Sequence, residues 1–240
     1  MVRHIFTGLA MAFALATPAS AQDVPAHGVV ELFTSQGCSS CPPADANLAK
    51  LAQDKNLVTL AYHVDYWDYL GWRDTLASPA NTERQHGYAR MFDARSVYTP
   101  QAVLNGRTHV NGADGPAVSA ALETSKLGVA VRLTRIDDRV VAETGTGPAP
   151  TGEAVIVFVW YKGDAAVKVE RGENKGDTIR YVNSVLSVST TGMYHGEAGR
   201  FEMPVSEAAK SGADGCAVLV QEIGPGGAPG AILGAAAIRL

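Results

Sequence analysis

The spacing of apolar residues changes near residue 128 of this 240-residue chain. Before that point, short apolar stretches alternate with stretches whose apolar residues recur at helical spacing; after it, nearly every apolar stretch is short and typical of a strand. Alternating strands and helices indicate an α/β domain, whereas strands alone indicate a β-sandwich. We therefore predict an α/β domain over residues 22–127 and an all-β, sandwich-like domain over residues 128–240.

The elements expected in the first half follow a characteristic order. Ser78 is the expected N-cap of a helix that begins at Pro79, and Asn105-Gly106 is a strong signal for a tight hairpin turn. We expect strands at 28–34 and 58–64, hairpin strands at 101–104 and 107–110, and helices at 43–53, 79–92 and 116–124. The order strand, helix, strand, helix, hairpin, helix is that of a thioredoxin fold.

The second half contains short apolar stretches separated by Gly, Asp, Asn and Pro. Eight strands are expected, at 129–134, 139–143, 154–161, 167–170, 178–188, 200–203, 216–222 and 231–238. Short strands at this spacing are typical of a β-sandwich.

The first 21 residues have the features of a signal peptide. A basic start, with Arg3 and His4, precedes an apolar stretch over residues 5–16, and small residues up to Ala21 fit a cleavage site. The apolar stretch is shorter than the about 20 residues that span a bilayer. We expect cleavage after Ala21, a periplasmic or secreted location and no membrane insertion of the mature chain.

Charge and composition exclude two further classes of protein. The formal net charge is −4, which gives no electrostatic attraction for nucleic acid or anionic lipid, so no nucleic-acid partner is expected. The hydrophobic content of 46% excludes a disordered chain.

Two cysteines, Cys38 and Cys41, lie between the first expected strand and the first expected helix, in the stretch GCSSCPPAD. Because the two prolines after Cys41 are tolerated only in a first helical turn, the helix should start near Ser39 or Ser40. A helix N-terminus stabilises a thiolate, so Cys38 is the expected exposed nucleophile, with a pKa below the free value of about 8.5. Cys41, inside the first turn, is the expected resolving thiol.

Pro100 directly precedes the expected hairpin strand in the stretch VYTPQ. Thioredoxin-fold oxidoreductases resemble one another in carrying a cis-proline here, facing the cysteine pair. We expect a cis Thr99–Pro100 bond, with the backbone of Thr99 available to a bound peptide. The alternative is a trans proline at the start of an edge strand.

Four long motifs carry a resemblance to a known family: VELFTSQGCSSCPPAD, YHVDYWDYLGWRD, VYTPQAVLNGR and RGENKGDTIRYVNSV. Together they resemble the exported bacterial proteins of domain-of-unknown-function family 1223, which are similar to thioredoxins in fold. The resemblance covers essentially the whole mature chain. It implies this architecture and a redox role in which Cys38, Cys41 and Pro100 match the family's cysteine pair and proline.

Polar residues near the pair have two interpretations each. The hydroxyls of Ser39 and Ser40 either donate to the Cys38 thiolate or cap the helix. Glu31, a lone charge in an apolar strand, either takes the proton of Cys41, as a carboxylate does in thioredoxins, or reaches solvent or a backbone N–H at the strand end.

Aromatic residues gather at the end of the second expected strand. Tyr66, Trp67 and Trp72 are candidates for contact with a substrate, and the alternative is a lid packed on the fold. The turn at residues 171–176 is interpreted as a hairpin connection with contacts across the two domains.

A metal site and a second reactive thiol are weaker hypotheses. His63, His86 and His109 are scattered and match no zinc spacing, so neither a metal nor a cofactor is expected. Cys216 lies in an apolar strand and is the expected buried, inert thiol.

These residues together predict an exported thiol-disulfide oxidoreductase with a Cys-Ser-Ser-Cys pair. Its expected partners are protein or small-molecule thiols and disulfides, including a dedicated redox partner. The alternatives are a redox-inactive binding module with a thioredoxin fold and a metal carrier. Ser39-Ser40 matches neither the Gly-Pro of thioredoxins nor the Pro-Tyr of glutaredoxins, so the direction of electron flow stays open.

Overall fold

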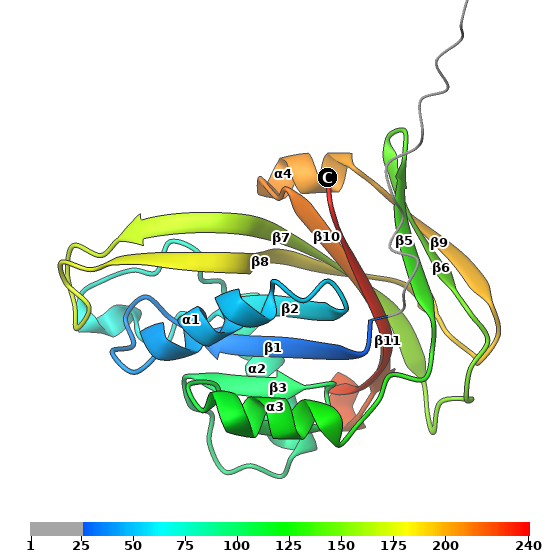
Figure 1. The fold of residues 1–240 in the computed structure, drawn as a ribbon, viewed down its shortest axis with the longest axis horizontal. Coiled ribbons are helices and arrows are strands. Elements are labelled where there is room, and N and C mark those ends of the chain that lie inside the picture. The colour runs from blue at the N-terminus through cyan, green and yellow to red at the C-terminus, as the bar shows by residue number, and fades with distance from the viewer. Residues whose placement is uncertain (1–25) are drawn as a thin grey trace, which may run out of the picture.

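A computed structural model describes residues 26–240 of the chain (Figure 1). It has mixed α/β structure, with one sheet of eight strands and a second sheet of three. The signal peptide expected at residues 1–21 lies outside the described residues. None of the described helices has the length and apolar character needed to cross a membrane.

The longer helices of the described chain lie in its first half, and the longest strands, β7 and β8, lie in its second half. The helices are α1 (Pro42–Leu51), α2 (Pro79–Met91), α3 (Gly115–Glu123) and α4 (Ser206–Ser211), with 3₁₀ turns η1 (Asp68–Leu70) and η2 (Pro225–Gly227). The strands are β1 (Gly28–Thr34), β2 (Leu57–His63), β3 (Gln101–Leu104), β4 (Thr108–Asn111), β5 (Val131–Ile136), β6 (Arg139–Thr144), β7 (Ala154–Lys168), β8 (Thr178–Met193), β9 (Gly199–Pro204), β10 (Gly215–Ile223) and β11 (Pro229–Arg239).

The eight-stranded sheet combines strands from both halves of the chain, in the order β11-β10-β7-β8-β2-β1-β3-β4. β1 and β2 are parallel over their whole length, and β2 meets β8 in parallel through Ala61 and Ser184. The other neighbours are antiparallel. The residues on either side of position 128 therefore share one sheet, and the tip of the β7–β8 hairpin reaches the side of the molecule where α1 begins (Figure 1).

Helices cover both faces of the β1–β4 part of this sheet. α1 and α3 pack on one face through small and branched side chains, and α2 packs on the other mainly through Tyr88. Ser78 is the N-cap of α2, as predicted, and its hydroxyl accepts from the N–H of Asn81 at 3.2 Å. Asn105 and Gly106 both have positive φ in the β3–β4 turn, in agreement with the predicted hairpin.

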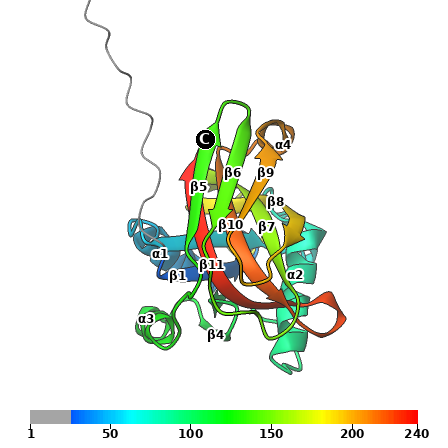
Figure 2. The ribbon, with the colours of Figure 1, turned by 90° about the vertical axis from the view of Figure 1, so that its right-hand side faces the viewer.

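The three-stranded sheet β5-β6-β9 packs against β7, β10 and β11 (Figure 2). Their shared core contains Leu133 and Val140 from the small sheet and Phe158, Trp160 and Val218 from the large one. The second half thus contains two packed sheets, but seven strands rather than the eight expected.

The prediction of a separate strand at 167–170 was wrong, because β7 continues unbroken from Ala154 to Lys168. Gly163 and Asp164 had indicated a turn. Gly163 instead leaves space for a guanidinium group, since a Cβ added there would lie 0.8 Å from Nη1 of Arg239. Asp164 pairs with Arg180 across the hairpin at 2.6 Å. The short helix α4 was not predicted.

Candidate functional site

Cys38 and Cys41 are joined by a disulfide, with Cα atoms 5.4 Å apart. Residues 38–41 form a turn in which the Cys41 N–H donates to the Cys38 carbonyl at 3.2 Å. Because of this turn, α1 begins at Pro42 and not near Ser39 or Ser40, and Cys41 is its N-cap and not a first-turn residue. The prediction that the prolines occupy the first turn is confirmed.

Cys38 is 1% exposed, so the prediction of an exposed nucleophile was wrong for the oxidised protein. Asn174, at the tip of the β7–β8 hairpin, explains part of this burial. Its amide Nδ2 donates to the carbonyls of Gln36 and Cys38, each at 3.0 Å. The N–H of Ser39 donates to Glu173 at 3.3 Å. The predicted contacts between residues 171–176 and the first half are therefore present, and they hold the hairpin tip against the backbone of the cysteine loop.

The two serines between the cysteines are exposed. The hydroxyl of Ser40 lies 3.4 Å from Sγ of Cys38. Neither Ser39 nor Ser40 caps α1, since Cys41 occupies the N-cap without a side-chain hydrogen bond. A contact between Ser40 and Cys38 is thus favoured over the capping interpretation.

The Thr99–Pro100 peptide bond is cis, as predicted. Trp67 links the loop at Thr99 to the cysteine loop: its Nε1 donates to Oγ1 of Thr99 at 2.8 Å. A Cβ added at Gly37 would lie 3.1 Å from Cβ of Trp67, so the two residues are in close contact. Trp67 therefore connects the residue before Cys38 with the residue before Pro100.

The other aromatic residues of this loop differ in exposure. Trp72 is half-buried, and its Nε1 donates to Oε1 of Gln36 at 2.9 Å. Tyr66 packs partly buried against the core, whereas Tyr69 is 78% exposed. Tyr66 and Trp72 thus have packing or hydrogen-bond partners, and Tyr69 has the most exposed ring of this loop.

Glu31 does not lie beneath Cys41. Side chains alternate along a strand, and Glu31 points to the face of β1 covered by α2, while α1 covers the other face. The carboxylate is buried and pairs with Arg84 at 2.7 Å. It also accepts a short hydrogen bond from the hydroxyl of Tyr88. Both interpretations of Glu31 are therefore wrong: it neither lies where it could take the proton of Cys41 nor reaches solvent or a backbone N–H of the described residues.

A cluster of buried polar residues lies at the ends of β1 and β2, behind the cysteine loop. Nδ1 of His63 is 2.8 Å from Oδ2 of Asp74, and both side chains are fully buried. Oδ2 of Asp74 also accepts from the backbone N–H of Gln36, at 2.8 Å. Burial raises the pKa of Asp74, but His63 and the backbone donors of Gln36 and Leu76 outweigh it, so that the pKa is lowered overall. This pair ties the loop before Cys38 to the aromatic loop.

Asp45 lies in the first turn of α1 and is 4% exposed. Neither of its carboxyl oxygens has a hydrogen-bond partner in the described part of the chain. Burial raises its pKa to about 7, while the nearby His63 and the hydroxyl of Thr34 act in the opposite direction. The carboxyl group of Asp45 therefore keeps its proton to a higher pH than an ordinary aspartic acid does.

Sequence reasoning did not identify Asp45, Asp74 or Asn174. An acidic residue in a first helical turn is normally expected to be exposed, where it interacts favourably with the helix dipole. Nothing in the neighbouring sequence indicates that Asp45 is buried. Asn174 is 136 residues from Cys38 along the chain. The only signal for it was the interpretation of residues 171–176 as a contact between the two halves.

Cys216 is fully buried in β10, as predicted, and burial raises its pKa well above the ordinary thiol value. Only a thiolate reacts readily, so we expect no labelling of Cys216 by a maleimide in the native oxidised protein. Mass spectrometry before and after unfolding checks this result, and rapid labelling of the native form would contradict it.

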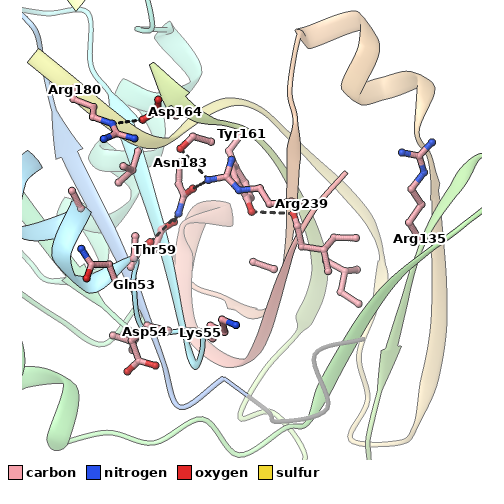
Figure 3. Close-up of a pocket in the computed structure, with 18 of the residues that line it drawn as sticks. Gln53, Asp54, Lys55, Thr59, Arg135, Tyr161, Asp164, Arg180, Asn183 and Arg239 are labelled. Atoms are coloured by element: carbon pink, nitrogen blue, oxygen red, sulfur yellow. Dashed lines mark hydrogen bonds and ion pairs between the residues drawn. The ribbon is translucent and has the colours of Figure 1, made fainter. Parts of the chain in front are cut away.

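A cleft of about 870 Å³ lies at the other end of α1 (Figure 3). Arg239 extends over the ring of Tyr161 and donates to Oδ1 of Asn183 at 3.2 Å, and Arg180 pairs with Asp164. The cleft is lined by the C-terminal end of α1, about 15 Å along the helix from the cysteines. It is therefore separate from the cysteine site.

Over residues 26–240, no three His, Cys, Asp or Glu side chains gather in a way that would hold a metal ion. His63 bonds to Asp74, and His109 lies 2.9 Å from the hydroxyl of Tyr98, so these two histidines have other partners.

Two solved structures are similar to this chain. A crystal structure of a protein from Agrobacterium tumefaciens has 45% sequence identity and a TM-score of 0.80, and the match covers 88% of this chain and 93% of that one. HBP35 of Porphyromonas gingivalis has a TM-score of 0.61 over 90% of this chain and 76% of its own, at 11% identity, which shows a similar fold only. No protein of curated function matches the chain.

The family resemblance expected from the four motifs is confirmed. A model described as "Protein of unknown function (DUF1223)" matches residues 29–221, far more than half of the sequence. The chain therefore belongs to the DUF1223 family.

Proposed function

We propose that this protein is an exported thiol-disulfide oxidoreductase with a thioredoxin-like first half. The arrangement of the first half supports the fold: strands in the order β2-β1-β3-β4, with α1 and α3 on one face and α2 on the other. The order of elements along the chain is the one expected from the sequence.

The observation that carries the function is the position of the cysteine pair. Cys38 and Cys41 lie at disulfide distance at the start of α1, where the positive end of the helix dipole stabilises a thiolate. Ser40, 3.4 Å from Sγ of Cys38, is a further donor to such a thiolate. Through Trp67, the cis Thr99–Pro100 loop is held next to the cysteine loop.

The proposed reaction is a two-electron exchange. The Cys38 thiolate attacks one sulfur of a substrate disulfide, and a mixed disulfide forms as the first substrate thiolate leaves. The Cys41 thiolate then attacks Sγ of Cys38 and displaces the second substrate thiolate. The cysteine pair is oxidised, the substrate is reduced to two thiols, and the two protons of the dithiol pass to these thiols. The reverse sequence oxidises a substrate dithiol.

The covered position of the disulfide favours a second candidate, a redox-inactive binding module. In that case Cys38–Cys41 is a structural staple, and Asn174 and Glu173 hold it permanently against the hairpin. A structural disulfide of this kind has a reduction potential below about −300 mV.

The two candidates differ in potential and in turnover. We expect the mature protein to equilibrate with glutathione redox buffers and to exchange with a disulfide substrate such as dithiobis(nitrobenzoate). Cys38→Ser should abolish the exchange, because the attacking sulfur is lost, and Cys216→Ser should leave it unchanged because that thiol is buried. Equal rates for wild type and Cys38→Ser, or a pair that glutathione cannot reduce, would favour the binding module.

The proposal that the protein is exported rests on the sequence of residues 1–21, which has a basic start, an apolar stretch and small residues before the expected cleavage site. N-terminal sequencing of the protein recovered from the periplasm or medium tests it. We expect the first residue to be Gln22; an intact Met1 in the cytoplasmic fraction would contradict export.

A further inference from the structure

A buried carboxyl group lies one helical turn beyond the resolving cysteine. The N–H of Asp45 donates to the carbonyl of Cys41 at 3.1 Å, and Cys41 already has helical backbone angles (φ −80°, ψ −36°). Residues four apart on a helix share a face, with Cβ atoms about 6 Å apart. Both side chains are buried, at 0% exposure for Cys41 and 4% for Asp45. Asp45 is therefore next to the thiol that forms when the disulfide is reduced.

The carboxyl oxygens of Asp45 are also not engaged by other groups. Neither has a hydrogen-bond partner in the described residues, although an unpaired buried polar group is costly. The groups that influence its charge come from each surrounding element: Thr34 from β1, His63 from β2, Asp74 from the loop before α2 and Tyr181 from β8. The hydroxyl of Thr34 is near enough to lower the pKa of Asp45, and it makes no other hydrogen bond in the described residues; the hydroxyl of Tyr181 has no partner there. Buried polar groups from β1, β2, β8 and the loop before α2 thus surround Asp45.

Other titratable groups near the site are already engaged. Glu31 faces the opposite side of β1 and is held by Arg84 and Tyr88. Nδ1 of His63 is bound to Asp74, and its Nε2 lies 3.4 Å from the hydroxyl of Ser184. Asp45 is left as the carboxyl that can exchange a proton with a thiol on its own helix face.

We propose that Asp45 is the acid–base group for Cys41, a role that rests on the proposed exchange reaction. As Cys41 attacks Sγ of Cys38 in the mixed disulfide, its S–H bond breaks and the proton passes to the Asp45 carboxylate. The substrate thiolate leaves with the electron pair of the broken S–S bond. Asp45 then releases the proton, which the departing thiolate takes up directly or through solvent. In the reverse direction, protonated Asp45 supplies the proton to the Cys41 thiolate as it leaves.

The two steps of the exchange can be timed separately with dithiobis(nitrobenzoate) and reduced protein. The first nitrothiobenzoate is released when Cys38 attacks, and the second when Cys41 closes the disulfide. We expect Asp45→Asn to slow the second release by about 100-fold near neutral pH, the usual contribution of a positioned acid–base group, and to leave the first release within about twofold. Asp54→Asn, an exposed carboxylate beyond the other end of α1, is the matched control and should change neither phase.

The pH profile and a direct titration give independent readouts. In wild type the second phase should rise with pH through the pKa of about 7 that burial gives Asp45, and in Asp45→Asn that inflection should be lost. Carboxyl NMR of the oxidised wild-type protein should show the same titration, even if the variant does not fold.

The outcomes separate the two proposals. Two release phases with an unchanged second rate in Asp45→Asn, or an Asp45 carboxyl that titrates at the ordinary value, would overturn this role and leave the exchange reaction standing. No release from reduced wild type would overturn the exchange and, with it, the role of Asp45.

Discussion

Replacing Arg84 with Met should lower the free energy of unfolding by about 3 to 5 kcal/mol, the usual result of removing one partner of a buried ion pair. The Arg84 side chain is 12% exposed, and its guanidinium contacts the fully buried carboxylate of Glu31 at 2.7 Å. It also donates to Oε1 of Gln221 in β10 at 2.9 Å and lies 5.2 Å from the centroid of the Tyr62 ring. The variant leaves Glu31 buried without a countercharge, and urea unfolding measures the loss.

Arg90→Met is the matched control on the same helix. Arg90 pairs with Glu83 on the surface, with side chains 53% and 68% exposed, so the expected loss is below about 1 kcal/mol. The double variant Glu31→Leu/Arg84→Met should recover part of the loss, because no buried charge is left unpaired. Similar losses for Arg84→Met and Arg90→Met would show that the buried pair does not stabilise the fold.

The hydrogen bonds around Arg84 also join the two halves of the chain, before and after residue 128. Gln221 donates to the hydroxyl of Tyr88 at 2.8 Å and to the carbonyl of Gly230 at 2.9 Å. A single buried cluster therefore joins β1 and α2 of the first half to β10 and β11 of the second. The spacing of apolar residues does change near residue 128, where we divided the chain into two predicted domains. This spacing gives no information about hydrogen bonds between residues far apart in the sequence, such as those of Gln221.

Local signals predicted those features that depend on a few neighbouring residues. Ser78 before Pro79 places a helix start, Asn105-Gly106 places a hairpin, and Cys38 and Cys41 lie within disulfide distance because three residues of spacing allow it. These features needed no knowledge of distant parts of the chain.

Burial around the cysteines could not be predicted in this way. Cys38 is bonded through its carbonyl to Asn174 of the β7–β8 hairpin, whose length was underestimated because Gly163 and Asp164 resemble a turn. The face that Glu31 occupies depends on which helix packs on which side of β1. The carboxyl proposed to exchange a proton with Cys41 is consequently that of Asp45 and not that of Glu31. Only the three-dimensional arrangement supports this choice.

The β7–β8 hairpin should control access to the disulfide, and we expect Asn174→Ala to speed reduction of Cys38–Cys41 by a small phosphine. Nδ2 of Asn174 makes two buried hydrogen bonds, to the carbonyls of Gln36 and Cys38. Cys38 is 1% exposed and its carbonyl is bonded to the hairpin tip, so we expect a reductant to reach its sulfur more readily when the tip moves away. Loss of the two bonds should favour the open form by about 1 to 2 kcal/mol, which corresponds to a roughly 5- to 30-fold faster reduction.

Lys175→Ala is the matched control, because Lys175 is the exposed neighbour of Asn174 at the same hairpin tip. Its reduction rate should equal that of wild type. Glu173→Ala should have a smaller effect than Asn174→Ala, since Glu173 accepts one longer bond, from the N–H of Ser39 at 3.3 Å. The reduction rates are measured at equal phosphine concentration by mass spectrometry of trapped thiols. We expect the rate to be highest for Asn174→Ala, lower for Glu173→Ala and lowest for Lys175→Ala, in the order of the hydrogen bonds lost. Identical rates in all three variants would mean that the hairpin tip does not limit access, and that local opening of the 36–41 loop exposes the disulfide instead.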